Sequence, residues 1–279
     1  MHTTPTDTPS DDFIQCWHAA GLFLESVSEK AVERLSPELL MLPSGYESGV
    51  CVWLKADLWP PFLEHISFRL GNQLFFVRLE DMENKVKVPG TRYGLQNLAN
   101  ACKGHACLMP MLKRGDQWLP ASSGWGLVSI PQTNIQPPHP DAYGLPVDPP
   151  ALVTSEKIEM TDWELQDFAV QVVRNSLPDD KVIAWDPSPD TAPSLWFMGD
   201  DGLEWVIIKA VRYPIKDAEP PYNLDTIADH CSSLSRKGNF AVVCVAATED
   251  PAKLQGEPLP LYRGHEMFFS YQGMKKLAV

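Results

Sequence analysis

The sequence predicts an α/β protein with mixed sheets (α+β), made of two tandem pseudo-repeats of an α-β-β-β-α-β-β unit. Two related stretches, YGLQNLANAC (93–102) and YNLDTIADHC (222–231), agree at the Tyr, Leu, Ala and Cys positions. Further short matches follow in the same order in both halves, as an internal duplication requires. Helical and strand periodicities also alternate in the same order in the two halves.

The further matches have slightly different spacings, as loop insertions would cause. They pair SDDFIQCW (10–17) with TDWELQDF (161–168), VCVW (50–53) with VIAW (182–185), Lys103-Gly104 with Lys237-Gly238, and LPASSG (119–124) with LPLYRG (259–264). Because chance matches have no reason to keep one order along the chain, we expect that one folding unit was copied.

Apolar residues at helical or alternating spacing predict the elements of the first half. Its hairpin turns at Gly71-Asn72, and KAVERLSPELLML (30–42) predicts an additional helix inserted after the first one. In chain order we expect a helix near 11–27, a strand at 49–55, a hairpin over 65–80, a helix at 94–102, a strand at 106–112 and a strand near 125–130.

The second half begins with a helix whose start carries a capping box, with Thr161 at the N-cap and Glu164 at N3. Asn223 is the expected N-cap of the next helix, which we expect to end at a glycine. In chain order we expect a helix from 161, a strand KVIAW (181–185), a hairpin over 194–214 turning at Gly199–Gly202, a helix over 223–238, a buried strand FAVVCVA (240–246) and a last strand EMFFSY (266–271).

The domain organisation follows from the repeat. We expect a first repeat domain over 1–130 and a second over 151–279. Between them lies PQTNIQPPHPDAYGLPVDPP (131–150), which contains seven prolines. A proline-rich segment is stiff and extended, so we interpret it as a linker rather than an element.

The charge distribution bears on partners. The formal net charge is −13, and residues 131–279 hold 22 acidic and 12 basic residues. This balance disfavours non-specific attraction to nucleic acid or to an anionic membrane. A protein is therefore the expected partner. No feature of the sequence indicates the identity of this partner or the oligomeric state.

The beginning of the sequence, its apolar runs and its cysteines indicate a cytoplasmic protein. The beginning, MHTTPTDTPSDD, contains neither the basic nor the apolar region of a signal peptide. The longest apolar run, FAVVCVAA (240–247), is too short to span a bilayer. Because six scattered cysteines in a chain of 279 residues do not form a small disulfide scaffold, we expect reduced, buried thiols.

The stretch GDDGLEWVIIKAVRY (199–213) and the order α-β-β-β-α-β resemble the PD-(D/E)xK, or restriction-endonuclease-like, superfamily. The resemblance covers about 160–250 and, more faintly, 10–115. A secretion-chaperone-like α-β-β-β-α-β-β fold fits the same order of elements. The nuclease resemblance implies a carboxylate two residues before a lysine on one face of a strand, where they would bind Mg²⁺ and position a water.

This catalytic pair is missing from both halves. Lys209 is preceded two places earlier by Ile207, and the corresponding Arg78 by Phe76. Glu204 lies five places before Lys209, a spacing that predicts the opposite face of the strand. We therefore expect two catalytically inactive nuclease-like domains with no cofactor. The alternative is a metal-dependent nuclease with a rearranged site that uses Lys209, Glu204 and the carboxylate of either Asp186 or Asp190.

The sequence gives little support for a zinc site, a hydrolase site, a phosphate-binding loop or a nucleic-acid stacking site. Cys102, His105 and Cys107 lack the spacing of a zinc site, so we expect core thiols there. There is no nucleophile elbow and no phosphate-binding glycine loop. Tryptophan side chains could stack on single-stranded nucleic acid, but their strand positions favour buried packing. These tryptophans are Trp118, Trp125, Trp185, Trp196 and Trp205.

A small basic patch is the remaining candidate binding site. Lys209, Arg212 and Arg263, with the nearby His265, could bind a carboxylate or a phosphate. The alternative is that Arg263 forms a structural salt bridge and that His265 is exposed. We therefore expect a non-enzymatic interaction, regulatory or adaptor protein. The nuclease and a secretion-chaperone-like module that binds an extended peptide are the alternatives.

Overall fold

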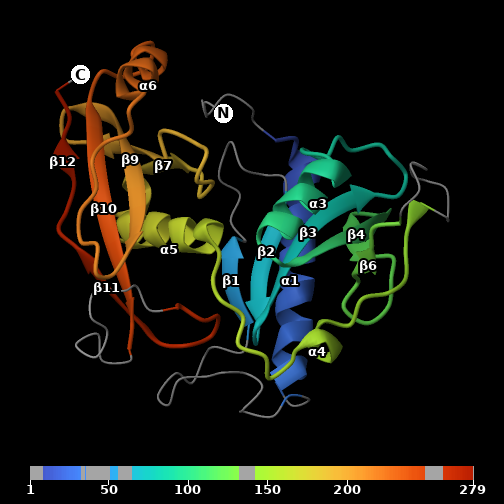
Figure 1. Cartoon of the computed structure of the whole chain (residues 1–279). Coiled ribbons are helices and arrows are strands. Elements are labelled where there is room, and N and C mark those ends of the chain that lie inside the picture. Colours follow the sequence, from blue (N-terminus) through green and yellow to red (C-terminus); the bar gives the residue numbers. More distant parts are fainter. Residues whose placement is uncertain are drawn as a thin grey trace. The chain divides into compact units, whose positions relative to one another are not determined.

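The computed structural model describes residues 9–32, 35, 51–55, 65–131, 142–248 and 260–278. It has the predicted α+β class, with two mixed sheets (Figure 1). The chain forms two compact units: the described residues up to Ile158 belong to the first, and those from Glu159 onward belong to the second.

The first unit contains a sheet of strand order β1-β2-β3-β4-β5, with β6 paired to β4. Among the described strands of this sheet, only β3 and β4 pair in parallel, and helix α3 connects them. The elements of this unit are α1 (Asp11–Val32), β1 (Cys51–Lys55), β2 (Ile66–Leu70), β3 (Gln73–Asp81), α3 (Arg92–Ala101), β4 (His105–Arg114), β5 (Gln117–Pro120), β6 (Val128–Ser129) and α4 (Pro149–Leu152).

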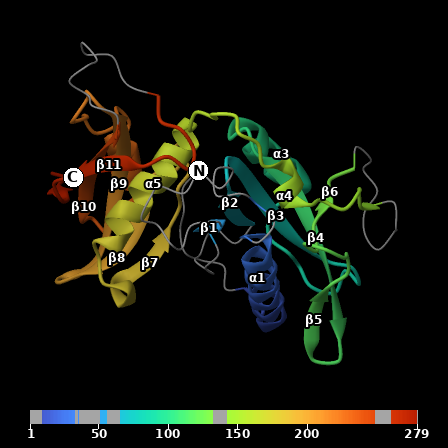
Figure 2. The ribbon, with the colours of Figure 1, turned by 90° about the horizontal axis from the view of Figure 1, so that it is seen from below.

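Two helices cover the two faces of the first sheet. Phe13, Trp17 and Leu24 of α1 pack in one core with Phe75 and Val77 of β3. Successive side chains of a strand point to opposite faces, so Phe76, which lies between Phe75 and Val77, points to the face that α3 covers. Figure 2 shows α1 and α3 on opposite sides of the sheet.

The second unit contains a sheet of strand order β11-β10-β9-β8-β7, with β12 paired to β10. In the described part of this sheet, β9 and β10 form the one parallel pair, and helix α6 connects these strands. The elements are α5 (Asp162–Asn175), the 3-10 helix η2 (Asp179–Lys181), β7 (Val182–Trp185), β8 (Leu195–Gly199), β9 (Gly202–Arg212), α6 (Leu224–Cys231), β10 (Gly238–Ala247), β11 (Met267–Tyr271) and β12 (Lys275–Lys276).

Two separate apolar cores lie on the two faces of the second sheet. Helix α5 packs against alternate residues of β9, among them Val206 and Ile208, and Figure 2 shows it along this strand. Helix α6 packs against the intervening residues, among them Trp205 and Ile207. The predicted capping box starts α5, because the backbone N–H of Thr161 donates to Glu164 (2.9 Å).

The two sheets share their strand order and their pairing directions. In each sheet, the first three strands pair antiparallel, and the fourth strand pairs in parallel with the third. Two further strands then pair with the fourth. A glycine where a side chain would not fit also lies directly before β4, at Gly104, and at the first residue of β10, Gly238. A Cβ at Gly104 would lie 2.9 Å from the ring of Phe76, and one at Gly238 would lie 2.5 Å from Trp205. The copying of one ancestral unit stays a prediction.

The boundary between the units differs from the predicted one. Residues 142–158 belong to the first unit, whereas the sequence suggested a linker over 131–150 and a second domain from 151. Ala142, Pro149 and Pro150 are buried, and 149–152 form α4. Proline fixes the backbone angle φ at a value that also suits the first turn of a helix, so Pro149 and Pro150 can begin α4.

Other elements differ in their ends. The predicted helix over 223–238 ends at Cys231, because hydroxyls of the following serines bind backbone carbonyls and compete with the helix. The short strands β5 and β12 were not predicted. Helix α1 extends to Val32, and the remainder of the predicted inserted helix (30–42), apart from Leu35, lies outside the described residues.

Candidate functional site

Arg263, predicted as part of a basic patch, lies inside the second unit. Its Nε is 2.8 Å from Oε1 of Glu164 and its Nη2 is 2.9 Å from Oε2. The exposed fractions of the two side chains are 0% and 5%. Arg263 therefore forms the structural salt bridge that the sequence offered as the alternative, and it is not available to bind a ligand at the surface.

The other members of the predicted patch are not brought together. Arg212 binds Glu159 (2.6 Å) and the carbonyl of Met160 (2.8 Å). Lys209 is exposed and, three residues from Arg212 on the same strand, points to the other face of the sheet. His265 is exposed, as the alternative interpretation expected. The four residues therefore do not form the predicted basic patch: one of them is buried, and the other three lie apart at the surface.

The carboxylates of the nuclease alternative are also dispersed. Asp186 is buried and accepts a hydrogen bond from the backbone of Ser188 (2.8 Å), while Asp190 is exposed. Glu204 accepts a hydrogen bond from Asn239 (2.9 Å) and alternates to the face opposite Lys209. Among the described residues, no three His, Cys, Asp or Glu side chains gather in a metal-binding arrangement.

The tryptophans and cysteines serve packing. All five of the tryptophans considered as a stacking platform are buried, which confirms the packing interpretation. The cysteines whose side chains are described are buried thiols. Burial raises the pKa of the Cys107 and Cys16 thiols to about 12. His105 binds the side chain of Gln73 (2.9 Å) and stacks on Phe75, so it has a structural role in the sheet.

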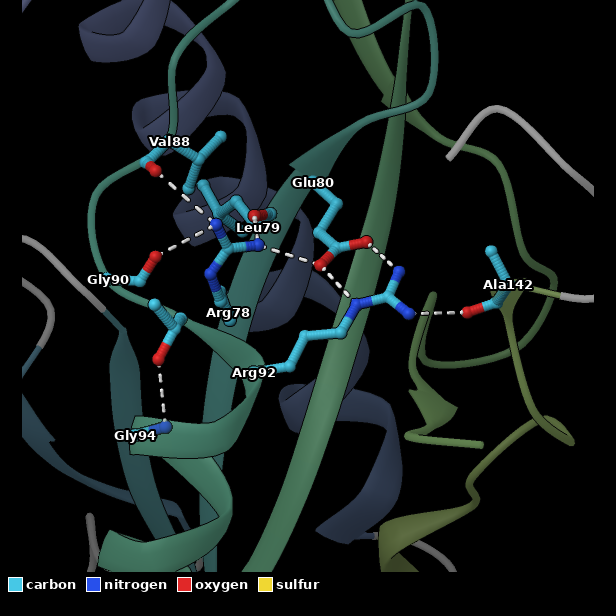
Figure 3. Close-up of polar contacts among 9 residues, drawn as sticks. Arg78, Leu79, Glu80, Val88, Gly90, Arg92, Gly94 and Ala142 are labelled. Carbon is cyan, nitrogen blue, oxygen red and sulfur yellow. Dashed lines mark hydrogen bonds and ion pairs between the residues drawn. The ribbon is translucent and has the colours of Figure 1, made fainter. Parts of the chain in front are cut away.

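A buried polar cluster in the first unit was not found from the sequence. Glu80, at the end of β3, binds Arg78 (2.7 Å) and, through both oxygens, Arg92 at the start of α3 (2.8 and 2.5 Å). Arg78 also donates to the carbonyls of Val88 and Gly90 (Figure 3). No sequence signature marks such a cluster, because its members come from a strand, a loop and a helix.

Arg92 also holds an extended segment, residues 142–147, which we call the strap. Its Nη1 donates to the carbonyl of Ala142 (2.9 Å; Figure 3). The guanidinium lies over the ring of Tyr143, and burial raises the pKa of this tyrosine to about 12. The strap then pairs with β6: Gly144 N–H donates to the Ser129 carbonyl (3.0 Å), and Ser129 N–H donates to the Leu145 carbonyl (2.9 Å).

The second unit has an open groove on the α6 face of its sheet. It has a volume of about 490 Å³. Helix α6 covers only part of this face, so the side chains of β10 beyond it form the floor of the groove. The lining includes Phe240, Val242, Cys244 and Ala246 of β10, Phe268 and Ser270 of β11, Tyr213, Lys216 and Asp217 of the loop after β9, and Lys275 of β12.

The floor of the groove is apolar and its rim carries charge. Lys216 and Lys275 line it, and Lys275 forms an exposed ion pair with Asp217 (3.5 Å). Cys244 Sγ lies 3.1 Å from the carbonyl of Ile215, and burial raises the pKa of this thiol. A neutral thiol leaves the floor suited to an apolar side chain.

One wall of the groove is an edge strand. β11 is the last strand of the sheet, and among the described residues it pairs only with β10. Phe268, which faces the groove, is 64% exposed, and Phe269 is 55% exposed. Natural proteins usually protect such edges with charge, proline or a covering segment, because the unpaired backbone binds other strands. MFFSY contains no charged residue and no proline, and no described strand pairs with its outer edge.

The comparisons with known proteins concern this second unit. The model of a family described as a domain of unknown function (DUF8840) matches residues 163–277, from α5 through β12. The matched range includes every residue that lines the groove. The chain has no match among curated proteins and none among solved structures. In the described part of the chain, no helix combines the length and apolarity of a membrane span.

Proposed function

We propose that this chain is a non-enzymatic interaction protein of the regulatory or adaptor kind, built from two catalytically inactive nuclease-like units. The partner is a protein, and the second unit binds it through the groove and the adjoining edge of β11. The interaction takes place in the cytoplasm, a location compatible with the buried cysteine thiols.

The observation that carries the proposal is the exposed edge of β11 beside an apolar groove. An unpaired strand offers backbone donors and acceptors to a peptide, and neighbouring pockets select its side chains. Here Phe268 and the β10 floor supply the apolar contacts. Aromatic side chains that become buried on binding contribute a large share of interface energy.

The same groove favours peptide binding, which the sequence suggested as the role of a secretion-chaperone-like module. A rearranged nuclease has no comparable support, since Lys209 and Glu204 face opposite sides of the sheet. Bulk electrostatics also makes nucleic acid the less suitable partner, because the chain carries a net charge of −13.

Photo-crosslinking of the full chain in its native cells tests the proposal. A photoreactive amino acid replaces Phe268 in one variant and Leu22, a 68% exposed residue of α1, in the control. We expect a discrete protein adduct from position 268 that the control does not form. If position 268 gives no protein adduct, or only the adducts of the control, the groove is not a protein-binding site.

A further inference from the structure

The first sheet completes its own edge with the strap. β6 pairs with β4 on one side, and on the other side Gly144 and Leu145 of the strap bond to Ser129. Val147 N–H donates to the carbonyl of Leu127, directly before β6. Val128 and Pro146 form the antiparallel bridge between the strap and β6. The strap therefore acts as an added strand that covers the backbone of β6.

The second sheet has an equivalent strand with no described cover. β12 pairs with β10 beside β11, as β6 pairs with β4 beside β5. Leu277 N–H donates to the Gly238 carbonyl, so in the alternating pattern of an antiparallel pair the backbone of Lys276 faces outward. Figure 1 shows β12 at the outer edge of its sheet. Within the described residues, no strand pairs with this side of β12.

The charge at this edge differs from that of the whole chain. Lys275 and Lys276 form β12, and Lys216 lies across the groove; all three are exposed. Asp217 is the acidic residue that lines the groove, and it already pairs with Lys275. The local surplus of positive charge in an acidic chain favours an acidic partner, because complementary potentials increase both specificity and association rate.

We propose that an extended, acidic segment of the partner protein adds as a strand to the edge formed by β12 and β11. Its backbone pairs with the outward groups of Lys276, as the strap pairs with Ser129. One large apolar side chain enters the groove beside Phe268, and flanking Asp or Glu residues approach the three lysines. This inference rests on the proposed function and specifies the chemistry and the binding mode of its partner.

The test starts from a displayed library of random twelve-residue peptides selected on the full chain. The most enriched sequence is then synthesised and used as the probe. We expect an acidic peptide that contains at least one aromatic or large aliphatic residue. Its binding is expected to slow amide hydrogen exchange of β11 and of Lys276. A neutral or basic consensus, or the absence of any enriched sequence, overturns the proposal.

Matched variants separate the lysines from general charge. Lys275→Glu with Lys276→Glu is expected to weaken binding of the probe about tenfold. The control, Lys87→Glu with Lys181→Glu, changes the net charge equally at other surfaces, and we expect the affinity of the parent chain. All four lysines are at the surface, so the variants are expected to fold. Equal weakening by both pairs contradicts the assigned edge.

Two further outcomes distinguish this inference from the proposed function. If a photo-adduct forms at position 268 but the probe leaves β11 and β12 unprotected from exchange, the protein interacts through the groove without strand addition. If sedimentation shows a dimer without any probe, and dimerisation protects the same amides, the edge belongs to a second copy of the chain. Either result overturns the acidic-strand proposal.

Discussion

Arg263 and Glu164 form a two-point ion pair across 99 residues of sequence, inside the second unit. Glu164 is also the N3 residue of the capping box that starts α5, so its carboxylate accepts hydrogen bonds from both the helix start and the guanidinium. The pair joins the segment before β11 to the start of helix α5.

Replacing Arg263 by Ala is expected to destabilise the second unit strongly. A buried carboxylate left without its partner costs about 3–5 kcal/mol. Arg212→Ala is the control, because the Arg212 pairs are partly exposed and exposed pairs contribute about 0–1 kcal/mol. Urea unfolding of the full chain, followed for the second unit by amide exchange, measures both. Similar losses for the two variants contradict the structural role of Arg263.

Arg92→Ala is expected to loosen the strap. The variant removes the bond to the Ala142 carbonyl and leaves Glu80 with one arginine. Amide exchange at Gly144 and Val147, whose N–H groups bond to the β6 region, should accelerate at least tenfold. Lys113→Ala, which removes a surface ion pair with Asp12, should leave these amides unchanged. Unaltered exchange in the Arg92 variant means that the strap is held by other contacts.

Alkaline conditions are expected to destabilise the first unit through its buried thiols. The pKa of Cys107 is raised to about 12 by burial, whereas an unfolded thiol has a pKa of about 8.5. Above that lower value the unfolded state loses a proton that the folded state retains, so stability falls as pH rises from 8.5 toward 12. At pH 10 the expected loss is about 2 kcal/mol for this thiol.

The measurement is the difference in unfolding free energy between pH 8 and pH 10, with and without Cys107→Ala. The variant removes one titrating group, so its alkaline loss should be smaller than that of the parent. A Cys231→Ala variant, in the second unit, is a suitable comparison, because burial also raises the pKa of the Cys231 thiol, to about 11. An identical alkaline loss in the parent and in Cys107→Ala would falsify the assignment.

A nuclease assay tests the alternative function. The purified chain is incubated with plasmid DNA and Mg²⁺ or Mn²⁺, in parallel with Lys209→Ala. We expect the same background in both, because the residue two places before Lys209 is the buried Ile207 rather than a carboxylate. Metal-dependent cleavage that disappears in the variant would establish the rearranged nuclease and remove the adaptor proposal.

The sequence predicted the elements well wherever local chemistry defines them. Thr161 and Glu164 marked the start of α5, and the glycines of both hairpins marked their turns. The Lys-Gly matches also have a physical basis, since Gly104 and Gly238 both lie against large side chains of the neighbouring strand. Such constraints act within a few residues or on one residue type, so a pattern can express them.

The candidate site was harder to predict, because it depends on tertiary contacts. The buried partner of Arg263 lies 99 residues away, and nothing in the local sequence indicates it. The groove lies over the part of β10 that the eight-residue helix α6 does not cover. The one local signal was MFFSY, an edge strand without charge or proline. Its position at the edge becomes apparent only from the strand order.

The strap has a practical consequence for dividing the gene. A fragment that stops at residue 130, the end suggested by composition, would leave Ser129 with unsatisfied hydrogen-bonding groups and would deprive Arg92 of its carbonyl acceptor. Such a fragment is expected to precipitate or to associate with itself during expression, whereas one that extends through Ile158 retains its native cover.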